Sequence, residues 1–199
     1  MKKILCFGDS NTYGFNPLTC GRYNTETRWT GILQELCKNK YEIIEAGCNN
    51  RTAFSDNPAG IEQTGYKVLP NYLKLNPDYI IFQIGINDLQ FQYNNSDIEN
   101  GFEKLITLTK SISNAHIIIL SAPELTTSVL KSPIFSKLFD ETSIKKSKEL
   151  ITILEKIAQK HNCKYIELNN IKVSAIDGLH YETKEHRIIA QTIYKHLNP

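Results

Sequence analysis

The 199-residue sequence has no long apolar run, little net charge and few cysteines. No stretch approaches the ~20 apolar residues of a membrane-spanning helix. The run from Ile4 to Phe7 is too short for the apolar region of a secretory signal. The 23 Lys and Arg against 21 Asp and Glu give a formal charge of +2, which provides no electrostatic basis for binding nucleic acid or an anionic membrane. We therefore expect a cytoplasmic protein without stable membrane insertion.

The cysteines are odd in number, widely spaced and without any CxxC pair, which is typical of reduced intracellular thiols rather than disulfides. No pair of Cys or His residues has the spacing of a zinc finger or ribbon, so we expect no metal site. The sequence predicts no cofactor of any other kind. The cysteines are Cys6, Cys20, Cys37, Cys48 and Cys163.

Short apolar runs with the composition of strands are spread along the whole chain. The third and fourth runs are almost continuously hydrophobic, which is typical of central parallel strands covered on both faces. The predicted strands are 3–7, 41–45, 79–84, 116–121 and 164–168.

Segments with helical spacing of apolar residues lie between these runs. Ser96 and Glu99 have the spacing of a capping box and predict the start of one helix. Residues 60–74 form a weaker helical segment, because Gly65 and Pro70 lie inside it. The stronger stripes are 29–36, 102–109, 144–158 and 188–197, the last containing Ile188, Ile189, Thr192, Ile193 and Leu197.

This alternation of strands and helices predicts a single α/β domain over residues 1–199, a three-layer sandwich around a five-stranded, mainly parallel sheet. Right-handed crossovers favour the flavodoxin-like strand order 2-1-3-4-5. Ligands bind beyond the carboxyl ends of the strands in such sheets. Ser10, the 47–52 loop and the 85–88 loop each follow a strand, so all three are expected on one rim.

Two irregular stretches, 11–28 and 122–142, interrupt this rhythm. Long loops in compact domains are usually functional or disordered. The apolar content of the second stretch indicates a lid, an acyl-pocket wall or a subunit contact, and it favours a homo-oligomer.

Ser10 stands in the stretch Gly8-Asp9-Ser10-Asn11, directly after the first predicted strand. A strand that ends in this way presents a hydroxyl from a rigid element, so Ser10 is a candidate nucleophile. The same residue types are also common in ordinary turns. The assignment therefore depends on a base and an orienting carboxylate elsewhere in the chain.

His180 is the best candidate for the base. It lies between the last strand and the terminal helix, and Asp177 precedes it by three residues with Gly178 between them. This spacing lets the carboxylate turn back toward the imidazole, although Asp-Gly on its own is also a common turn. The remaining histidines have ordinary interpretations as caps or surface residues: His116, His161, His186 and His196.

Two loops offer donors for an oxyanion, which usually makes the largest electrostatic contribution to acyl transfer. Asn87 follows the third strand and has a side-chain amide. The small, polar loop from Gly47 to Thr52 follows the second strand and can turn a backbone N–H inward.

Gly8-Asp9-Ser10, the 46–52 loop, Gly85-x-Asn87-Asp88 and Asp177-x-x-His180 together resemble, in order and spacing, the four blocks of the SGNH (GDSL-type) hydrolases. The stretches Asp9 to Gly14, Arg28 to Gly31 and Glu45 to Thr52 are similar to the arylesterase and acyltransferase branch of that family. The resemblance covers essentially the whole chain and implies the fold predicted above.

The resemblance also implies a function without a cofactor. It makes Ser10 the nucleophile, His180 the general base and Asp177 its orienting partner. The implied oxyanion donors are the Ser10 backbone N–H, a second-block backbone N–H and the Asn87 side chain. Asn50 aligns where the second block usually carries Gly, and Gly47 is the other choice for that donor. Asn tolerates positive φ better than most residues do.

The expected activity is that of a serine esterase acting on small carboxylic esters through an acyl-enzyme, and acyl transfer to alcohols is also allowed. The apolar 122–142 loop and the aromatic residues Tyr13, Phe15 and Tyr23 favour short acyl chains or aryl esters. One alternative is a flavodoxin-like nucleotide or flavin binding module. It is disfavoured because no phosphate-binding glycine motif is present and because it leaves Asp177 and His180 unexplained. Another alternative is a noncatalytic assembly role.

Overall fold

The central sheet has the predicted parallel strand order β2-β1-β3-β4-β5 within residues 1–168 and 170–197, the part of the chain that this computed structural model describes. All four strand pairs are parallel, and β1 lies between β2 and β3. The strands are β1 (Lys2–Gly8), β2 (Tyr41–Gly47), β3 (Tyr79–Gln83), β4 (His116–Leu120) and β5 (Lys164–Ile166). The predicted α/β class is thus confirmed.

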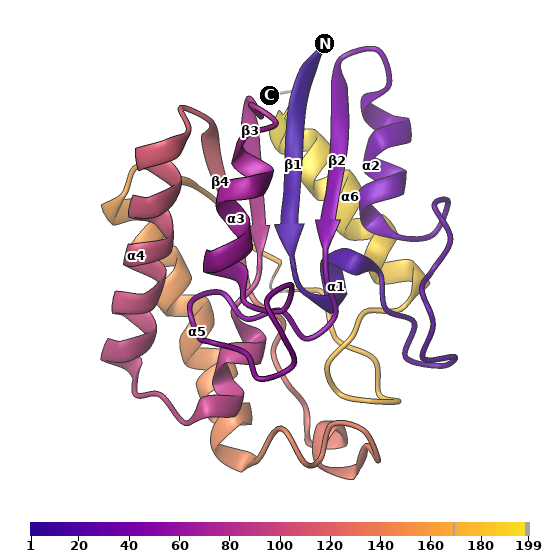
Figure 1. Cartoon of the computed structure of the whole chain (residues 1–199). Helices are drawn as coiled ribbons and strands as arrows, with labels where there is room; N and C mark the ends of the chain where they lie inside the picture. Colours follow the sequence, from indigo (N-terminus) through magenta and orange to yellow (C-terminus); the bar gives the residue numbers. More distant parts are fainter. Residues whose placement is uncertain (169, 198–199) are drawn as a thin grey trace.

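Helices cover both faces of the sheet, which explains why the central strands are hydrophobic along their length (Figure 1). In β1, Ile4 and Cys6 pack with one layer while Leu5 and Phe7 pack with the other, because successive side chains of a strand point to opposite faces. One layer contains α2 (Trp29–Cys37) and α6 (Thr183–Leu197). The other contains α3 (Gly65–Leu73), α4 (Asn95–Ile112) and α5 (Glu141–Lys160).

The start of α4 differs from the prediction. Asn94, not Ser96, is the N-cap: its side chain accepts from the Asp97 N–H, and the Asp97 carboxylate accepts in return from the Asn94 N–H. Ser96 and Glu99 lie inside the helix instead. The physical reason is that an N-cap must keep an extended backbone, and the chain turns into the helix two residues earlier than the Ser96 pattern suggested.

The terminal helix α6 buries two residues of the predicted stripe, Ile189 and Ile193, but not the whole stripe. Its buried residues are His186, Ile189, Ala190 and Ile193. Ile188, which the prediction placed in the stripe, is exposed. His186 was expected to be a cap or surface residue; it is buried, so the surface alternative is wrong. The spacing of three, four and seven residues from His186 is the pattern that identifies the buried face.

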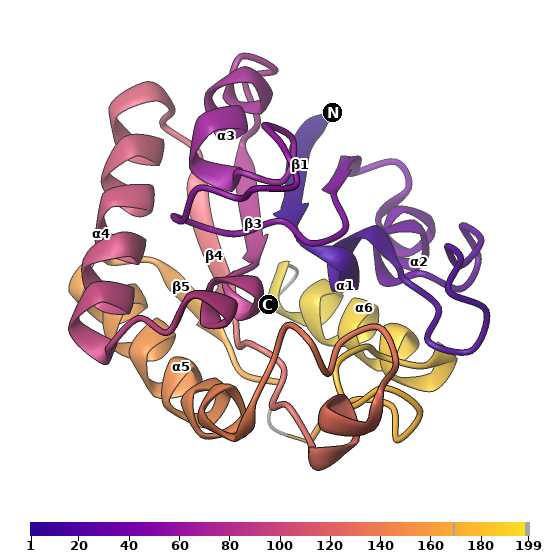
Figure 2. The ribbon, with the colours of Figure 1, turned by 60° about the horizontal axis from the view of Figure 1, so that its bottom comes forward.

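Neither long stretch is wholly irregular. The first begins as a short helix, α1 (Ser10–Tyr13), and the second contains the 3-10 helix η2 (Thr127–Lys131). A further 3-10 helix, η1 (Ile86–Phe91), follows β3. Figure 2 brings forward the end of the molecule at which the strands finish, and it shows α1 and these loops gathered there.

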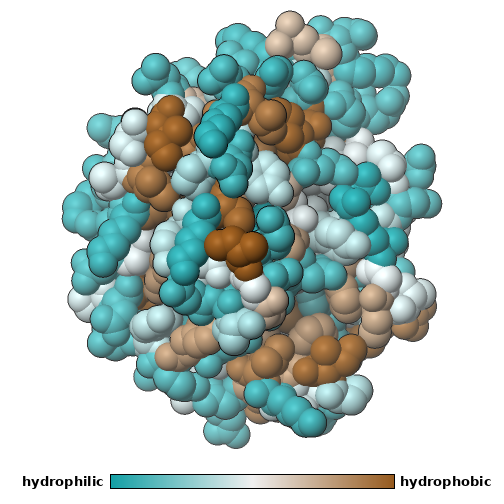
Figure 3. Space-filling model, in the orientation of Figure 1, coloured by the Kyte–Doolittle hydropathy of each residue, from teal (hydrophilic) through white to brown (hydrophobic). Residues whose placement is uncertain are grey.

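Residues 122–142 are partly core and partly surface. Leu125, Val129 and Phe139 are buried, whereas Ile134 and Leu138 are about half exposed or slightly less. Figure 3 shows apolar surface along the lower edge of the molecule, the end at which the strands finish. Among the helices in the described residues, none combines the length and apolar character needed to cross a bilayer.

Candidate active site

A tight strand-to-helix turn places Ser10 at the carboxyl end of β1. Asp9 is the N-cap of α1, and its carboxylate accepts from the Asn11 N–H at 2.9 Å. Ser10 is the first helical residue. Gly8 is required immediately before the turn, because a Cβ there would lie 2.1 Å from Thr12 Oγ1 and 2.4 Å from the Gln83 carbonyl oxygen.

A second tight turn forms the segment that carries Asp177 and His180. Gly178 has a φ of 72°, in the left-handed region that favours glycine. A Cβ at Gly178 would lie 2.4 Å from the Val129 backbone nitrogen, so the turn is packed directly against η2. The Thr126 N–H also donates to the Gly178 carbonyl oxygen at 3.1 Å. Residues of the 122–142 stretch therefore support the histidine turn.

These two turns bring Ser10, His180 and Asp177 into one hydrogen-bonded chain. His180 Nε2 lies 2.8 Å from Ser10 Oγ, and His180 Nδ1 lies 2.7 Å from Asp177 Oδ2. Asp177 Oδ1 also accepts from the backbone N–H groups of Leu179 and His180, both at 3.0 Å. When Nδ1 carries the ring proton and donates it to the carboxylate, Nε2 is unprotonated and can accept the serine proton.

The surroundings of these three side chains keep Asp177 ionised. All three side chains are largely buried, with exposed fractions of 5% for Ser10, 4% for Asp177 and 1% for His180. Burial alone would raise the pKa of Asp177, but the hydrogen bond and charge of His180 and the two backbone N–H donors outweigh it, so the pKa is lowered.

Asn87 and Asn50 lie close together and share a partner. Gln90 Nε2 donates to Asn50 Oδ1 at 3.0 Å and to Asn87 Oδ1 at 3.1 Å. Asn87 Nδ2 donates one hydrogen to the Arg51 carbonyl oxygen at 3.0 Å, which leaves its second hydrogen available to a ligand. Asn50 has a φ of 60°, a conformation that Asn tolerates.

Gly47, the other choice for the second-block donor, has a clear packing role. It is the last residue of β2, and a Cβ there would lie 2.2 Å from the Tyr13 backbone nitrogen. Glycine at this position lets β2 approach α1 closely.

Two buried charged residues to which sequence reasoning assigned no role hold the second-block loop and the residues directly after it. Asp88 accepts from the N–H groups of Ala53, Phe54 and Ser55 and from Ser55 Oγ. Burial raises the pKa of Asp88 to about 6, although these donors oppose the shift. Arg51 donates to the Gly8 and Ala46 carbonyl oxygens at 3.3 and 2.6 Å, which fixes the loop to the ends of β1 and β2.

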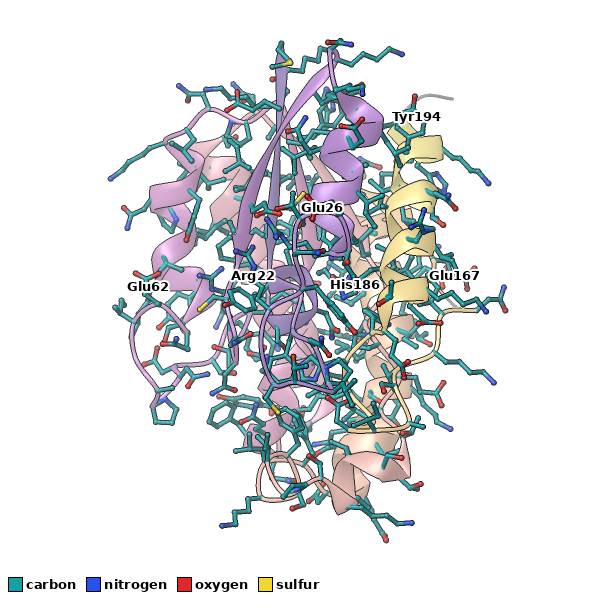
Figure 4. All side chains as sticks on the ribbon, turned by 90° about the vertical axis from the view of Figure 1, so that its right-hand side faces the viewer. Arg22, Glu26, Glu62, Glu167, His186 and Tyr194 are labelled. Atoms are coloured by element: carbon teal, nitrogen blue, oxygen red, sulfur yellow. The ribbon has the colours of Figure 1, made fainter. Side chains whose placement is uncertain are left out.

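His186 of α6, labelled in Figure 4, connects this helix to α2. Its Nδ1 accepts from the Trp29 N–H at 3.3 Å and so caps α2, whose N-cap residue Arg28 makes no side-chain cap. Trp29 Nε1 in turn donates to the Asn11 carbonyl oxygen at 3.1 Å. Burial lowers the pKa of His186 to about 4, with a smaller contribution from His180, so this imidazole is neutral at neutral pH.

Two aromatic rings flank His180. Phe15 lies with its centroid 4.3 Å from that of the imidazole, and Phe135 lies 5.2 Å from it. The two phenyl rings meet edge to face at 6.1 Å. Of the other aromatic residues predicted near the nucleophile, Tyr13 packs under the Arg22 guanidinium and Tyr23 packs against His186.

Comparison with protein families gives a match over almost the whole chain. The model of the GDSL-like lipase/acylhydrolase family matches residues 6–194. The chain belongs to this family. It is a carboxylic ester hydrolase of the SGNH type, which goes against the alternative of a flavodoxin-like binding module. Among curated protein sequences, none matches the chain significantly.

Solved structures of this GDSL-like family resemble the chain along its full length. The inhibitor-bound aryl esterase of M. smegmatis is 26% identical, with a TM-score of 0.89 and coverage of 99% of this chain and 98% of that one. A carbohydrate acetylesterase from Sinorhizobium meliloti is 27% identical, with the same TM-score and coverage. A lipase/acylhydrolase from Enterococcus faecalis, 20% identical with a TM-score of 0.71 and coverage of 99% and 95%, shares the fold.

Proposed function

We propose that Ser10, His180 and Asp177 are the catalytic triad of a serine esterase that hydrolyses small carboxylic esters through an acyl-enzyme. The observation that carries this proposal is the pair of hydrogen bonds, 2.7 and 2.8 Å long, that joins the carboxylate to the imidazole and the imidazole to the hydroxyl. This is the geometry that an activated serine nucleophile requires.

The first half of the reaction transfers the acyl group to the enzyme. Ser10 Oγ attacks the ester carbonyl carbon while its proton passes to His180 Nε2, and the ionised Asp177 stabilises the imidazolium. The tetrahedral intermediate then collapses: the bond to the alcohol oxygen breaks, and this oxygen takes the proton from Nε2. The second half repeats these steps with water as the nucleophile and Ser10 Oγ as the leaving group.

The oxyanion is stabilised in this proposal by the Ser10 N–H, the Asn50 N–H and the free hydrogen of Asn87 Nδ2. The Ser10 N–H is in the first turn of α1 and has no acceptor within the helix. The positive φ of Asn50 and the Gln90 contacts that fix both asparagines support this set over the alternative with Gly47. We expect Asn87→Ala to lower kcat by about 10²–10³.

The aryl esterase and the carbohydrate acetylesterase suggest the substrate class. It comprises esters of short acyl groups with aryl or sugar alcohols. Water is the proposed acceptor, and transfer to alcohols remains part of the prediction. A cytoplasmic location and a homo-oligomer also remain predictions. The exposed Ile134 and Leu138 favour the oligomer, and sedimentation velocity tests it.

The deciding experiment compares hydrolysis of p-nitrophenyl acetate, butyrate and octanoate by the wild type, Ser10→Ala and His180→Ala. Matched controls are Ser111→Ala and His116→Ala, which alter exposed residues of the same types. We expect both site variants to lose at least about 10³-fold in kcat and both controls to keep wild-type rates. Full activity in Ser10→Ala would contradict the proposed mechanism.

A further inference from the structure

A series of hydrogen bonds fixes the direction in which the Asn50 side-chain amide points. The Arg51 carbonyl oxygen can only accept, so Asn87 turns its NH2 group toward it, at 3.0 Å. Asn87 Oδ1 then accepts from Gln90 Nε2 at 3.1 Å, and the same nitrogen donates to Asn50 Oδ1 at 3.0 Å. Each group determines the orientation of the next. The Asn50 amide therefore holds its oxygen toward Gln90 and turns its NH2 group away from it.

The backbone of Asn50 is fixed as well. Asn57 Nδ2 donates to the Asn50 carbonyl oxygen at 2.7 Å, and Asn50 has a φ of 60°. Within residues 1–168 and 170–197, neither the backbone N–H nor Nδ2 of Asn50 donates to a protein acceptor. The residue is half-buried, and its Nδ2 does not belong to the buried side-chain atoms that lack a partner. A ligand can therefore reach this NH2 group.

The oxyanion of the proposed reaction does not need this NH2 group. Its three lone pairs are taken by the three proposed donors, which are the N–H groups of Ser10 and Asn50 and the free hydrogen of Asn87. The leaving oxygen lies toward His180, because that imidazole returns the proton to it. The part of the substrate that remains beside Asn50 is the acyl group, so an acceptor for Nδ2 has to lie on the acyl group.

We propose that the Asn50 side chain selects acyl groups with an oxygen on the carbon next to the carbonyl, as in alkoxyacetyl and 2-hydroxyacyl esters. Nδ2 donates to that oxygen while the backbone N–H of the same residue donates to the oxyanion. A hydrocarbon chain in this place displaces water from Nδ2 and offers it no acceptor, which weakens binding. The inference rests on the proposed function, since it requires the oxyanion to lie at the backbone N–H of Asn50.

The test uses two p-nitrophenyl esters of equal length, the methoxyacetate and the butyrate, in which an oxygen replaces one CH2 group. The difference in their intrinsic reactivity cancels when the ratio of their kcat/KM values is compared between a variant and the wild type. Asn50→Gly keeps the backbone N–H and tolerates the positive φ, but it removes the amide. We expect it to lower the methoxyacetate-to-butyrate ratio by about tenfold.

Gln90→Glu should lower the ratio as well, because a carboxylate cannot donate to Asn50 Oδ1 and draws Nδ2 toward itself. Asn49→Gly is the matched control: it makes the same change at an exposed residue of the same loop and should preserve the ratio. An Asn50→Gly enzyme with the wild-type ratio would overturn the inference, and so would an equal loss for both esters, which indicates an effect on the oxyanion or the fold. Failure of the proposed function is distinguishable, since it appears as activity that survives Ser10→Ala.

Discussion

The Asn11 side chain forms hydrogen bonds with the backbone of the residues on both sides of His180. Its Nδ2 donates to the carbonyl oxygen of Leu179 and its Oδ1 accepts from the N–H of Tyr181, each at 3.3 Å. The residue that follows the proposed nucleophile thus fixes the peptide groups on either side of the proposed base. The buried Asn11 amide and the Ser10–His180 hydrogen bond together link the two turns, which are 170 residues apart in the sequence.

Removal of this amide is expected to loosen the site as well as the fold. Asn11→Ala leaves a buried carbonyl and a buried N–H without partners, so we expect a loss of about 2–4 kcal/mol in the free energy of unfolding. Turnover should also fall at least about tenfold, because His180 loses its fixed position. Urea denaturation and p-nitrophenyl acetate kinetics measure the two effects. Asn95→Ala, which removes an exposed amide, serves as the control, and an Asn11→Ala enzyme with wild-type kcat would contradict the positioning role.

We expect Asp177→Asn to hold His180 in the tautomer that carries its proton on Nε2, in which it cannot act as the base. The N–H groups of Leu179 and His180 both point at Asp177 Oδ1, so the amide oxygen of an asparagine must take that place. Its NH2 group then faces Nδ1, which has to accept, and the proton moves to Nε2, where it blocks removal of the Ser10 proton. We expect kcat to fall by about 10⁴ with little change in KM.

This effect has a readout beyond activity. The imidazole NH resonance in NMR should move from Nδ1 to Nε2 in Asp177→Asn, while the fold is retained. A variant that keeps the Nδ1 proton and still loses activity would rule out the tautomer explanation.

Asp9 is expected to make the fold less stable as pH rises. Burial raises its pKa to about 7, with the charge of Asp88 adding to the shift and the Asn11 N–H and Arg51 opposing it. Between about 4 and 7 the folded protein therefore holds this proton while the unfolded chain has lost it, so stability declines through that window. Above this pH window, the buried charge of Asp9 lowers the free energy of unfolding by at most about 4 kcal/mol.

Asp9→Asn removes the charge and keeps a good N-cap residue. We expect the variant to be more stable than the wild type at about pH 8 and the difference to vanish near pH 4, as measured by urea denaturation across this range. Asp56→Asn is the control, because the pKa of this exposed carboxyl is lowered by Lys67 and the sign of its effect is opposite. If the stability gain of Asp9→Asn does not change with pH, burial of the Asp9 charge is not its cause.

Gly8→Ala is expected to displace Ser10. The added methyl group would collide with Thr12 Oγ1 and with the Gln83 carbonyl oxygen, and the second of these belongs to the rigid backbone of the sheet. We expect a loss of about 1–3 kcal/mol in stability and a large drop in kcat. Gly21→Ala, whose Cβ would meet only Thr19 Oγ1 at 3.3 Å, should leave both unchanged. If Gly8→Ala and Gly21→Ala have the same stability and kcat, the predicted collision at Gly8 is wrong.

Local patterns in the sequence determined much of this protein. The near-continuous apolar runs predicted central parallel strands, and the chirality of crossovers then predicted the strand order that is observed. Since the carboxyl ends of parallel strands share one edge, the residues after β1, β2 and β3 were expected to meet, and Ser10, Asn50 and Asn87 do lie there. The four short blocks together also indicated the family that the comparison shows.

Only the tertiary structure decided how the site is supported. Phe135 reaches His180 from a stretch whose apolar content indicated a lid, an acyl-pocket wall or a subunit contact without choosing among them. Asn11 contacts the backbone on both sides of His180 from the other end of the sequence. His186 was expected to be a cap or a surface residue, and only the structure shows that it caps α2 from within the core. Hydrophobic periodicity records which face of an element is buried, whereas the partner of a buried polar group depends on where distant segments lie, and that is fixed only when the chain packs.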